Sequence, residues 1–300
     1  MSTMNKSVSI IIPNYNGKNL LQTNLPFIEK ARKYSKNRII EIIVVDDYST
    51  DGSVEFLKKY YSNIKLIKHR KNRGFSSSVN TGVRTAKGDL VVLLNSDVIP
   101  SYDFVFTALA DFESEMVFGV SFNEEGYSWA KAKFVNGYVE HEPGYITEQT
   151  HPSFWVNGGS GIFRRNVWIE IGGMDEILLN PFYWEDIDLS YRAQKRGYIT
   201  LWEPKAKVIH KHEGTIGSLP KKYVQRVRER NELLFIWKNI TSASLFKKHL
   251  AGLAGRVIKH PGYSIIVLMA LAKILKVISA RRKEQKESTV SDEAIFSRYK

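Results

Sequence analysis

Short apolar runs alternate with helix-like stretches through the first hundred residues. The runs are rich in Ile, Val or Leu and occupy residues 8–12, 41–45, 64–67 and 90–94. Apolar side chains recur at the spacing of one helix face in residues 20–34, 53–60 and 76–86. Strand–helix–strand repetition with continuously apolar strands predicts a mostly parallel central sheet with helices on both faces, a Rossmann-like α/β fold.

Polar, turn-forming residues follow each of these four predicted strands. The segments are PNYNG from Pro13, DDYSTDG from Asp46, NRGF from Asn72 and NSD from Asn95. In an open α/β sheet the ligand lies beyond the carboxyl ends of the strands. This edge of the sheet is therefore the predicted functional site, and two of its four segments carry carboxylates.

The pattern loosens after the fourth strand and then becomes regular again. Aromatic residues, glycines and charges are interleaved over residues 121–150, which predicts antiparallel strands and loops. Regularity returns at residues 154–161, and residues 185–195 are typical of a helix that opens on two acidic side chains. Residues 207–210 are the last predicted strand.

The character of the chain changes at about residue 220. Residues 223–237 and 245–259 are typical of basic amphipathic helices, and 263–279 is strongly apolar apart from Lys273 and Lys276. The last twenty residues, 281–300, are polar and are predicted to be disordered. We therefore expect a main α/β domain over 1–218, a basic helical appendage over 219–280 and a polar tail over 281–300.

Composition narrows the classes of protein. The chain contains no cysteine, which excludes disulfide frameworks, zinc–thiolate sites, iron–sulfur clusters and cysteine nucleophiles. The N-terminal residues lead directly into a predicted strand and lack the pattern of a signal peptide, so we expect a cytoplasmic protein.

The net charge of +13 is concentrated in one region. Residues 220–286 hold sixteen Lys and Arg against three Glu, whereas the rest of the chain is balanced. A local basic block predicts a polyanionic partner, either nucleic acid or an anionic membrane. No zinc-finger, helix-turn-helix or RNA-binding aromatic motif accompanies it, so we expect no nucleic acid.

The apolar stretch at 263–279 favours the membrane as partner. It is shorter than the roughly twenty apolar residues of a spanning helix and holds two lysines, so an interfacial helix on the inner face of the cell membrane fits better. The alternative is a helix that packs on the catalytic domain while its lysines extend into water.

Three sets of polar side chains are candidates for chemistry. Asp97 ends an apolar strand and is a suitable ligand for a hard divalent cation, although the triplet from Asn95 also suits a simple turn. Glu185 and Asp186 open a helix, where they either cap it or provide a positioned base. His210 and a second histidine at position 212 share one side of a predicted strand and are candidates for binding metal or phosphate.

Six segments in order together resemble the family-2 glycosyltransferases, which have the GT-A type of nucleotide-diphospho-sugar-binding fold. The segments span residues 7–217: VSIIIPNYNG, EIIVVDDYSTDGS, NRGFSSSVNTGVRTAKGDLVVLLNSDV, WVNGGSGIFRRNVWIEIGGMDE, YWEDIDLSYRAQKRGY and VIHKHEGTIG. Within that family, the chain resembles the rhamnosyltransferase-like enzymes that act on bacterial or archaeal surface polysaccharides. It implies transfer of a sugar from a nucleotide-sugar donor to a glycan or lipid-linked acceptor.

The resemblance also implies a role for each matching residue. Residues implied to contact the nucleotide or donor are Pro13, Tyr15, Asp46, Asp47, Arg73, Gly74, Phe75, Asn95, Trp155, Gly158 and Gly159. Asp97 and His210 would hold Mn²⁺ or Mg²⁺. Asp186, with Glu185 beside it, would be the general base of an inverting transfer.

One departure from the family pattern concerns the metal. The triplet begins with Asn95 where many relatives have Asp, which keeps an oxygen ligand and loses a charge. Two other classes of protein share this arrangement of strands and helices. A dinucleotide-dependent oxidoreductase lacks support because PNYNG holds a single glycine. A non-catalytic sugar-nucleotide binder is disfavoured by the intact Asp97, Asp186 and His210.

Overall fold

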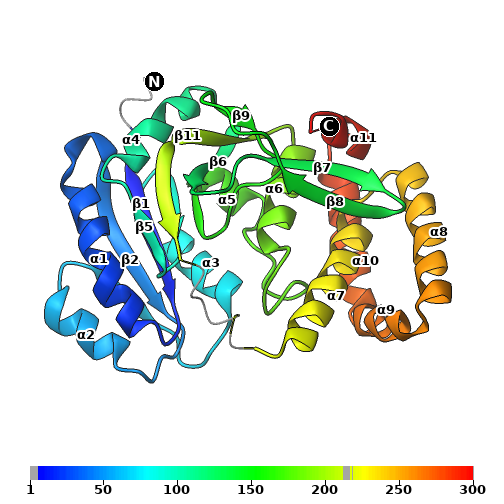
Figure 1. The fold of residues 1–300 in the computed structure, drawn as a ribbon, viewed down its shortest axis with the longest axis horizontal. Helices are drawn as coiled ribbons and strands as arrows, with labels where there is room; N and C mark the ends of the chain where they lie inside the picture. The colour runs from blue at the N-terminus through cyan, green and yellow to red at the C-terminus, as the bar shows by residue number, and fades with distance from the viewer. Residues whose placement is uncertain (1–5, 212–216, 218, 300) are drawn as a thin grey trace.

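The computed structural model describes residues 6–211, 217 and 219–299. A large sheet carries helices on both faces, and a two-stranded hairpin joins it to a group of C-terminal helices (Figure 1). The strands are β1 (Val8–Asn14), β2 (Ile39–Asp46), β3 (Lys65–Lys68), β4 (Leu90–Leu94), β5 (Val98–Pro100), β6 (Val117–Glu124), β7 (Ala130–Val135), β8 (Tyr138–Pro143), β9 (His151–Pro152), β10 (Ser160–Arg164) and β11 (Ile199–His210). The helices are α1 (Lys18–Lys33), α2 (Ser53–Tyr60), α3 (Phe75–Thr85), α4 (Phe104–Leu109), α5 (Arg165–Glu170), α6 (Glu185–Lys195), α7 (Lys221–Asn239), α8 (Ala243–Lys259), α9 (Ser264–Leu271), α10 (Ile274–Glu287) and α11 (Asp292–Ser297), with 3₁₀ turns η2 (Ser35–Asn37), η3 (Ala110–Glu113) and η5 (Pro261–Tyr263).

The large sheet has the strand order β3-β2-β1-β4-β10-β6-β11-β5, with β9 paired to β11. Strands β1 to β4 pair in parallel, as the alternating pattern predicted. In the second half, β10 runs antiparallel to β4 and β6, and β11 is parallel to β6 but antiparallel to β5. The sheet is therefore mixed, and the predicted α/β class with helices on both faces is confirmed.

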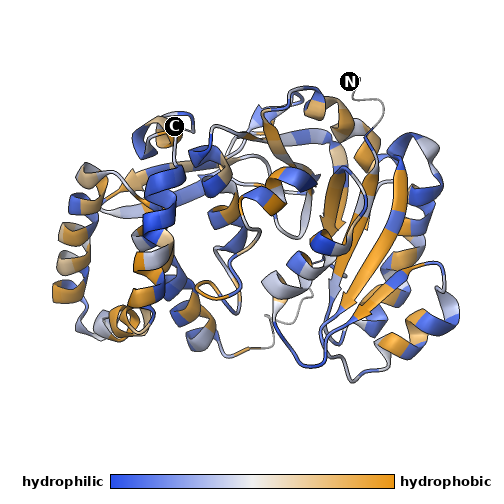
Figure 2. Ribbon diagram, turned by 180° about the vertical axis from the view of Figure 1, so that it is seen from behind, coloured by the Kyte–Doolittle hydropathy of each residue, from blue (hydrophilic) through white to orange (hydrophobic). Residues whose placement is uncertain are grey.

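Both faces of the sheet are buried, which explains the continuously apolar strands. Alternate side chains of β1 enter different cores: Ile10 and Ile12 pack with α1, α2 and α4, whereas Ile11 packs with α3, α5 and α6. A Cβ added at Gly82 of α3 would lie 2.4 Å from Ile11 Cγ2, so a glycine there lets α3 approach the sheet closely. The central strands of the sheet are accordingly coloured as hydrophobic along most of their length in Figure 2.

The C-terminal helices share a third core with the β7–β8 hairpin and α6. Residues 233–237 of α7 are all buried, so the second half of this helix is enclosed by protein. The expected C-terminal helical appendage is therefore present as α7–α11, and α7 packs between α6 and the other C-terminal helices (Figure 1). The basic residues of 219–280 therefore belong to helices that pack around a hydrophobic core.

The apolar stretch expected as one helix over 263–279 is broken. It forms η5, α9 and the start of α10, and the ammonium of Lys273 at the break donates to the carbonyl of Leu178 at 2.7 Å. Among the described residues no single helix is long and apolar enough to cross a membrane. Pro261–Leu271 and Ile274–Glu287 together have the length and apolar composition of a membrane-crossing segment, but the two helices are bent by 70° relative to each other.

The C-terminal tail is also folded as far as residue 299, where disorder was expected. Residues 281–287 complete α10, and α11 places Ile295, Phe296 and Tyr299 in the third core. Asp292 is buried and receives a 2.7 Å hydrogen bond from the Lys195 ammonium. The polar composition of the tail concealed these three apolar anchors.

Candidate active site

The ends of β1 and β2 are joined by a buried hydrogen bond. Asn14 Nδ2 donates to Asp46 Oδ1 at 3.0 Å, and the amide of Ser49 donates to Asp46 Oδ2 at 3.0 Å. Asp46 is fully buried, whereas Tyr15 beside Pro13 is 40% exposed. The predicted base and ribose residues therefore lie at one sheet edge, with Asp46 shaping the loops and Tyr15 presenting an accessible ring.

Asp47 organises the next loop. Its Oδ1 lies 2.7 Å from Nδ1 of the buried His69, and its Oδ2 accepts the amide of Gly74 at 2.7 Å and that of Arg73 at 3.1 Å. Gly74 has φ +86°, a conformation that favours glycine, and α3 begins at Phe75. Asp47 thus fixes the backbone of 73–75, while the Arg73 side chain is exposed. His69 was missed in the sequence because no pattern linked it to Asp47.

Asp97 and His210 meet, as their placement at two strand ends predicted. His210 Nε2 lies 3.1 Å from Asp97 Oδ1, and His210 Nδ1 lies 3.1 Å from Glu124 Oε1. Burial lowers the pKa of His210, but the hydrogen bonds and charges of the two carboxylates outweigh it and raise that pKa to about 9. Glu124, at the end of β6, was missed because residues 121–150 gave no clear strand boundary.

The segment from Asn157 to Ser160 connects these groups. Glu124 Oε1 accepts from Asn157 Nδ2 at 2.8 Å and from Ser160 Oγ at 2.5 Å. The amide of Asn95 donates to the carbonyl of Gly159 at 2.8 Å. A Cβ at Gly159 would lie 2.5 Å from Asn95 Nδ2, so only a glycine allows this approach.

Asp186 lies on the other side of the same segment. Its Oδ2 accepts the amide of Gly158 at 3.3 Å, and a Cβ at Gly158 would approach Asp186 Cβ to 3.2 Å. A chain of contacts therefore runs from Asp186 through residues 157–160 to Glu124, His210 and Asp97. The structure brings the candidate base and the candidate metal ligands together, although they are separated by up to 113 positions in the sequence.

The two acidic residues predicted to open a helix do so, since α6 begins at Glu185. Burial raises the pKa of Asp186 against the opposing effect of three backbone amides, those of Ile187, Gly158 and Asp186 itself. Burial, with the charge of Asp186, raises the pKa of Glu185 to about 8. Tyr183 and Trp184 immediately before them have φ of 69° and 75°, left-handed conformations that are strained for non-glycine residues and concentrate at functional sites.

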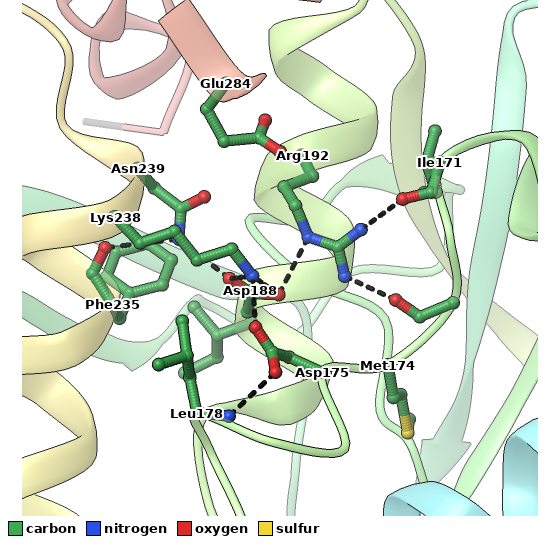
Figure 3. A network of polar contacts seen from close by, with 12 residues as sticks. Ile171, Met174, Asp175, Leu178, Asp188, Arg192, Phe235, Lys238, Asn239 and Glu284 are labelled. Carbon is green, nitrogen blue, oxygen red and sulfur yellow. Dashed lines mark hydrogen bonds and ion pairs between the residues drawn. The ribbon is translucent and has the colours of Figure 1, made fainter. Parts of the chain in front are cut away.

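A buried network of ion pairs and hydrogen bonds joins α6 to α7 (Figure 3). Asp188 Oδ2 accepts from Arg192 Nε at 2.8 Å and from Lys238 Nζ at 3.0 Å, and its Oδ1 accepts from Asn239 Nδ2 at 2.7 Å. Lys238 also donates to Asp175 Oδ2 at 2.8 Å. The helix that carries Asp186 is therefore anchored to α7, which no sequence motif indicated.

An aromatic cluster of Trp155, His141 and Trp184 lies next to the start of α6, the helix that carries Asp186. Trp155 is half-buried, and its ring meets that of His141 edge-on at 4.9 Å; His141 in turn meets Trp184 at 6.0 Å. Burial, with the charge of Arg228, lowers the pKa of His141, so this imidazole is neutral at pH 7. His141 comes from β8 of the hairpin and was not singled out in the sequence.

The donor set suits a divalent cation in part. A carboxylate and an imidazole are ligands for Mn²⁺, and Glu124 holds the second nitrogen of His210 as an outer partner does in metal sites. Over 6–211, 217 and 219–299, no group of three or more His, Asp or Glu side chains is arranged to hold an ion. Asp97, His210 and the amide oxygen of Asn95 would thus need oxygens from a bound diphosphate. Position 212 lies outside the described residues.

Two curated proteins resemble the chain over most of its length. The poly-beta-1,6-N-acetyl-D-glucosamine synthase of Staphylococcus aureus (strain MSSA476) is 25% identical over 237 residues, covering 76% of this chain and 56% of that protein. The N-acetylglucosaminyl-diphospho-decaprenol L-rhamnosyltransferase of Mycobacterium tuberculosis (strain CDC 1551 / Oshkosh) is 24% identical over 220 residues, covering 61% and 70%. The chain spans about half the length of the first of these relatives.

A solved structure shares the fold. The mannosyltransferase from Pyrobaculum calidifontis in complex with GDP-Man and Mn²⁺ has a TM-score of 0.56 at 17% identity, covering 93% of this chain and 87% of that one. The family model described as Glycosyl transferase family 2 matches residues 9–168, which is more than half of the chain. That match contains Asp46, Asp97 and Gly158 at the sheet edge. The chain belongs to glycosyl transferase family 2, with a GT-A fold.

Proposed function

We propose that the chain transfers a sugar from a nucleotide-diphospho-sugar to a hydroxyl group of a glycan or lipid-linked glycan, in polysaccharide or cell-surface synthesis. One observation carries this proposal: residues 157–160 connect Asp186, through the amide of Gly158, to Glu124 and so to the pair formed by His210 and Asp97. The polysaccharide synthase among the relatives and the GDP-Man complex among the structures support the reaction class.

The proposed donor site is the edge formed by β1, β2 and the loop at 73–75. Tyr15, beside Pro13, offers an accessible ring for the base, and the loops held by Asp46 and Asp47 enclose the nucleoside. The guanidinium of Arg73 lies 3.4 Å from Glu176 Oε2 and is 45% exposed near the same edge, where it would face the diphosphate. Phe75 supports the loop from the core side.

Asp186 is the proposed general base. It removes the proton of the acceptor hydroxyl, whose oxygen attacks the anomeric carbon from the face opposite the leaving nucleoside diphosphate, so the configuration inverts. The raised pKa of Asp186 brings it closer to the operating pH, which suits proton transfer. We assign Trp155 and His141 to the acceptor side of the proposed site. Their aromatic rings, which meet at 4.9 Å, would pack against the sugar ring of the acceptor.

Asp97 and His210 are the proposed ligands of Mn²⁺ or Mg²⁺. Such an ion neutralises charge on the departing diphosphate. The chain's own contribution is positional: Glu124 orients His210, and His210 lies against Asp97. The Mn²⁺ in the mannosyltransferase complex is consistent with divalent metal use.

The proposal includes a peripheral location on the inner, cytoplasmic face of the cell membrane. The excess of basic residues in 220–286 would be attracted to anionic lipids at that face. A membrane-bound or lipid-linked acceptor would then be within reach of Asp186. Nucleic acid is not a proposed partner.

A ligand panel tests the proposed function. The thermal midpoint of the purified chain is followed with nucleotides and nucleotide-sugars, with and without Mn²⁺ or Mg²⁺. A metal-dependent rise with one nucleoside diphosphate, lost in Asp97→Ala, is expected because ligands that bind only the folded state stabilise it. A rise with nicotinamide cofactors alone, and none with any nucleotide-sugar, would overturn the proposal.

A further inference from the structure

A groove of about 800 Å³ lies between α7, the end of α8, η5 and α9. Among the described residues, those that line it all belong to the C-terminal helices (Figure 1), and none is a candidate active-site residue. The ionisable side chains that line it are Lys222, Arg226, Glu229, Arg256 and His260, and Ile265 lines its apolar side. The groove therefore combines a basic wall with an aliphatic one.

The basic wall is poorly neutralised. Lys222 and Arg226 are one helical turn apart on α7, and neither forms an ion pair with a carboxylate among the described residues. The guanidinium of Arg256 lies 3.5 Å from the centre of the Tyr138 ring, and its Nη1 donates to the hydroxyl of Tyr263 at 3.4 Å. Arg256 is thus held in place by aromatic side chains, while Glu229 is the one carboxylate that lines the groove in the described part of the chain.

The aliphatic wall continues onto an exposed apolar surface. Ile265, Leu268 and Leu271 recur every three residues along α9 and are 45%, 65% and 43% exposed. Leu275, at the start of α10, is 81% exposed. Figure 2 shows the hydrophobic colouring of α9 at the lower edge of the C-terminal helices, next to α8. Contiguous apolar side chains beside a basic rim are typical of surfaces that contact a membrane.

We propose that this groove binds the phosphate head group of an anionic phospholipid while the exposed side chains of α9 enter the bilayer surface. The proposal rests on the membrane location included in the proposed function and names the surface responsible. Lys222 and Arg226 supply charge complementary to the phosphate, and Ile265 adjoins the acyl chains. A nucleic acid would match the charge alone and would leave Leu268 and Leu275 uncovered.

The placement of the groove connects the bilayer to the active site. Arg226 and Lys222 lie on the first half of α7, and Lys238 near its end holds Asp188 of α6. One helix therefore bears both the lipid-binding residues and the anchor of the helix that carries Asp186. Binding at the groove would set the orientation of the active site relative to the membrane surface.

Co-sedimentation with vesicles tests the proposal on the full chain. Vesicles of phosphatidylcholine containing phosphatidylglycerol are compared with pure phosphatidylcholine. Replacing Lys222 and Arg226 together by Gln is expected to weaken partition to the anionic vesicles about thirtyfold, since each basic residue near the surface contributes about 1 kcal/mol. The matched control replaces two exposed lysines of α2, Lys58 and Lys59, by Gln and should leave partition within about twofold.

A second variant addresses the groove itself. No atom lies within 4 Å of a Cβ added at Gly262, so Gly262→Glu should fold while placing a negative charge in the groove. It is expected to weaken vesicle binding as the double variant does, without changing the thermal shift by nucleoside diphosphate. That unchanged shift separates loss of lipid binding from failure of the proposed glycosyltransferase function.

Two outcomes would overturn the inference. One is equal partition of the wild type, the Lys222/Arg226 double variant and Gly262→Glu into the anionic vesicles, which would assign any membrane contact to another surface. The other is tight binding of the wild type to a single-stranded oligonucleotide, lost in the double variant, with no binding to vesicles.

Discussion

Lys238 of α7 lies with its ammonium 3.0 Å from Oδ2 of Asp188, two residues after the candidate base. Both side chains are buried, and Lys238 bridges Asp188 to Asp175. Although burial alone raises the pKa of Asp175, the charge of Lys238 holds it well below its usual range. The C-terminal helices are therefore part of the framework of the active site.

Replacing Lys238 by Met should destabilise the chain by about 3 kcal/mol, because Asp175 and Asp188 would remain buried with part of their compensation removed. Urea unfolding at neutral pH measures the loss. Lys221→Met, at an exposed position on the same helix, is the control and should change stability by less than about 1 kcal/mol. Equal effects of both variants would contradict an anchoring role for Lys238.

Asp292→Ala should also destabilise the chain, by about 3–5 kcal/mol. The Asp292 carboxylate accepts from the Tyr191 hydroxyl at 2.7 Å, and Lys195 would be left buried without its ion pair. Thermal and urea unfolding measure the effect, with exposed Glu293→Ala as control. A tail that contributes nothing to the fold would make both variants equivalent to the wild type.

The parallel half of the fold could be predicted well from the sequence, because the apolar runs along the chain coincide there with the buried strands. Every side chain of β4 is buried between two helical layers, so residues 90–94 could be predicted to the residue. The C-terminal unit was harder, because Lys238, Lys195 and Asp292 are charged residues in a core, and composition treats them as surface. Their partners lie 50 to 97 positions away, beyond the reach of any local pattern.

The residues of the candidate site divide in the same way into those that the sequence predicted and those that it did not. Asp97, Asp186 and His210 followed from strand ends, a helix start and the family motifs. Glu124, His69 and His141 did not, since each sits in a segment without a motif. Nothing near Glu124 in the chain points to His210, which is 86 positions away.

Glu124→Gln should lower the apparent affinity for Mn²⁺ in the presence of nucleoside diphosphate about 10- to 100-fold, as loss of an outer partner of a ligating histidine does. The change keeps an oxygen near Asn157 and Ser160 but removes the charge that faces His210. Calorimetric titration with Mn²⁺ measures it. The neighbouring exposed Glu125→Gln is the control, and equal affinities would remove Glu124 from the site.

Glu185 gives the chain a pH-dependent stability. Burial raises its pKa to about 8 from an unfolded value of 4.5. The proton is therefore bound more tightly in the folded state, so the contribution is complete below pH 4.5 and is lost as the pH rises through 8. Glu185→Gln imitates the neutral acid and should match the wild type at low pH but exceed its stability above pH 8. Urea unfolding across this range measures the difference, and a constant gap would contradict it.

Asp186→Asn should lower the rate of transfer about 10²- to 10⁴-fold, the usual contribution of a general base. Asparagine keeps an oxygen that can accept the amide of Gly158, so the local backbone and the donor site should persist. Nucleotide titration followed by thermal midpoint should give the same affinity in variant and wild type, while product formation is nearly lost. The exposed Glu170→Gln on α5 controls for charge removal. Full activity in Asp186→Asn would assign proton removal to another group, and Glu185 would then be the next residue to replace.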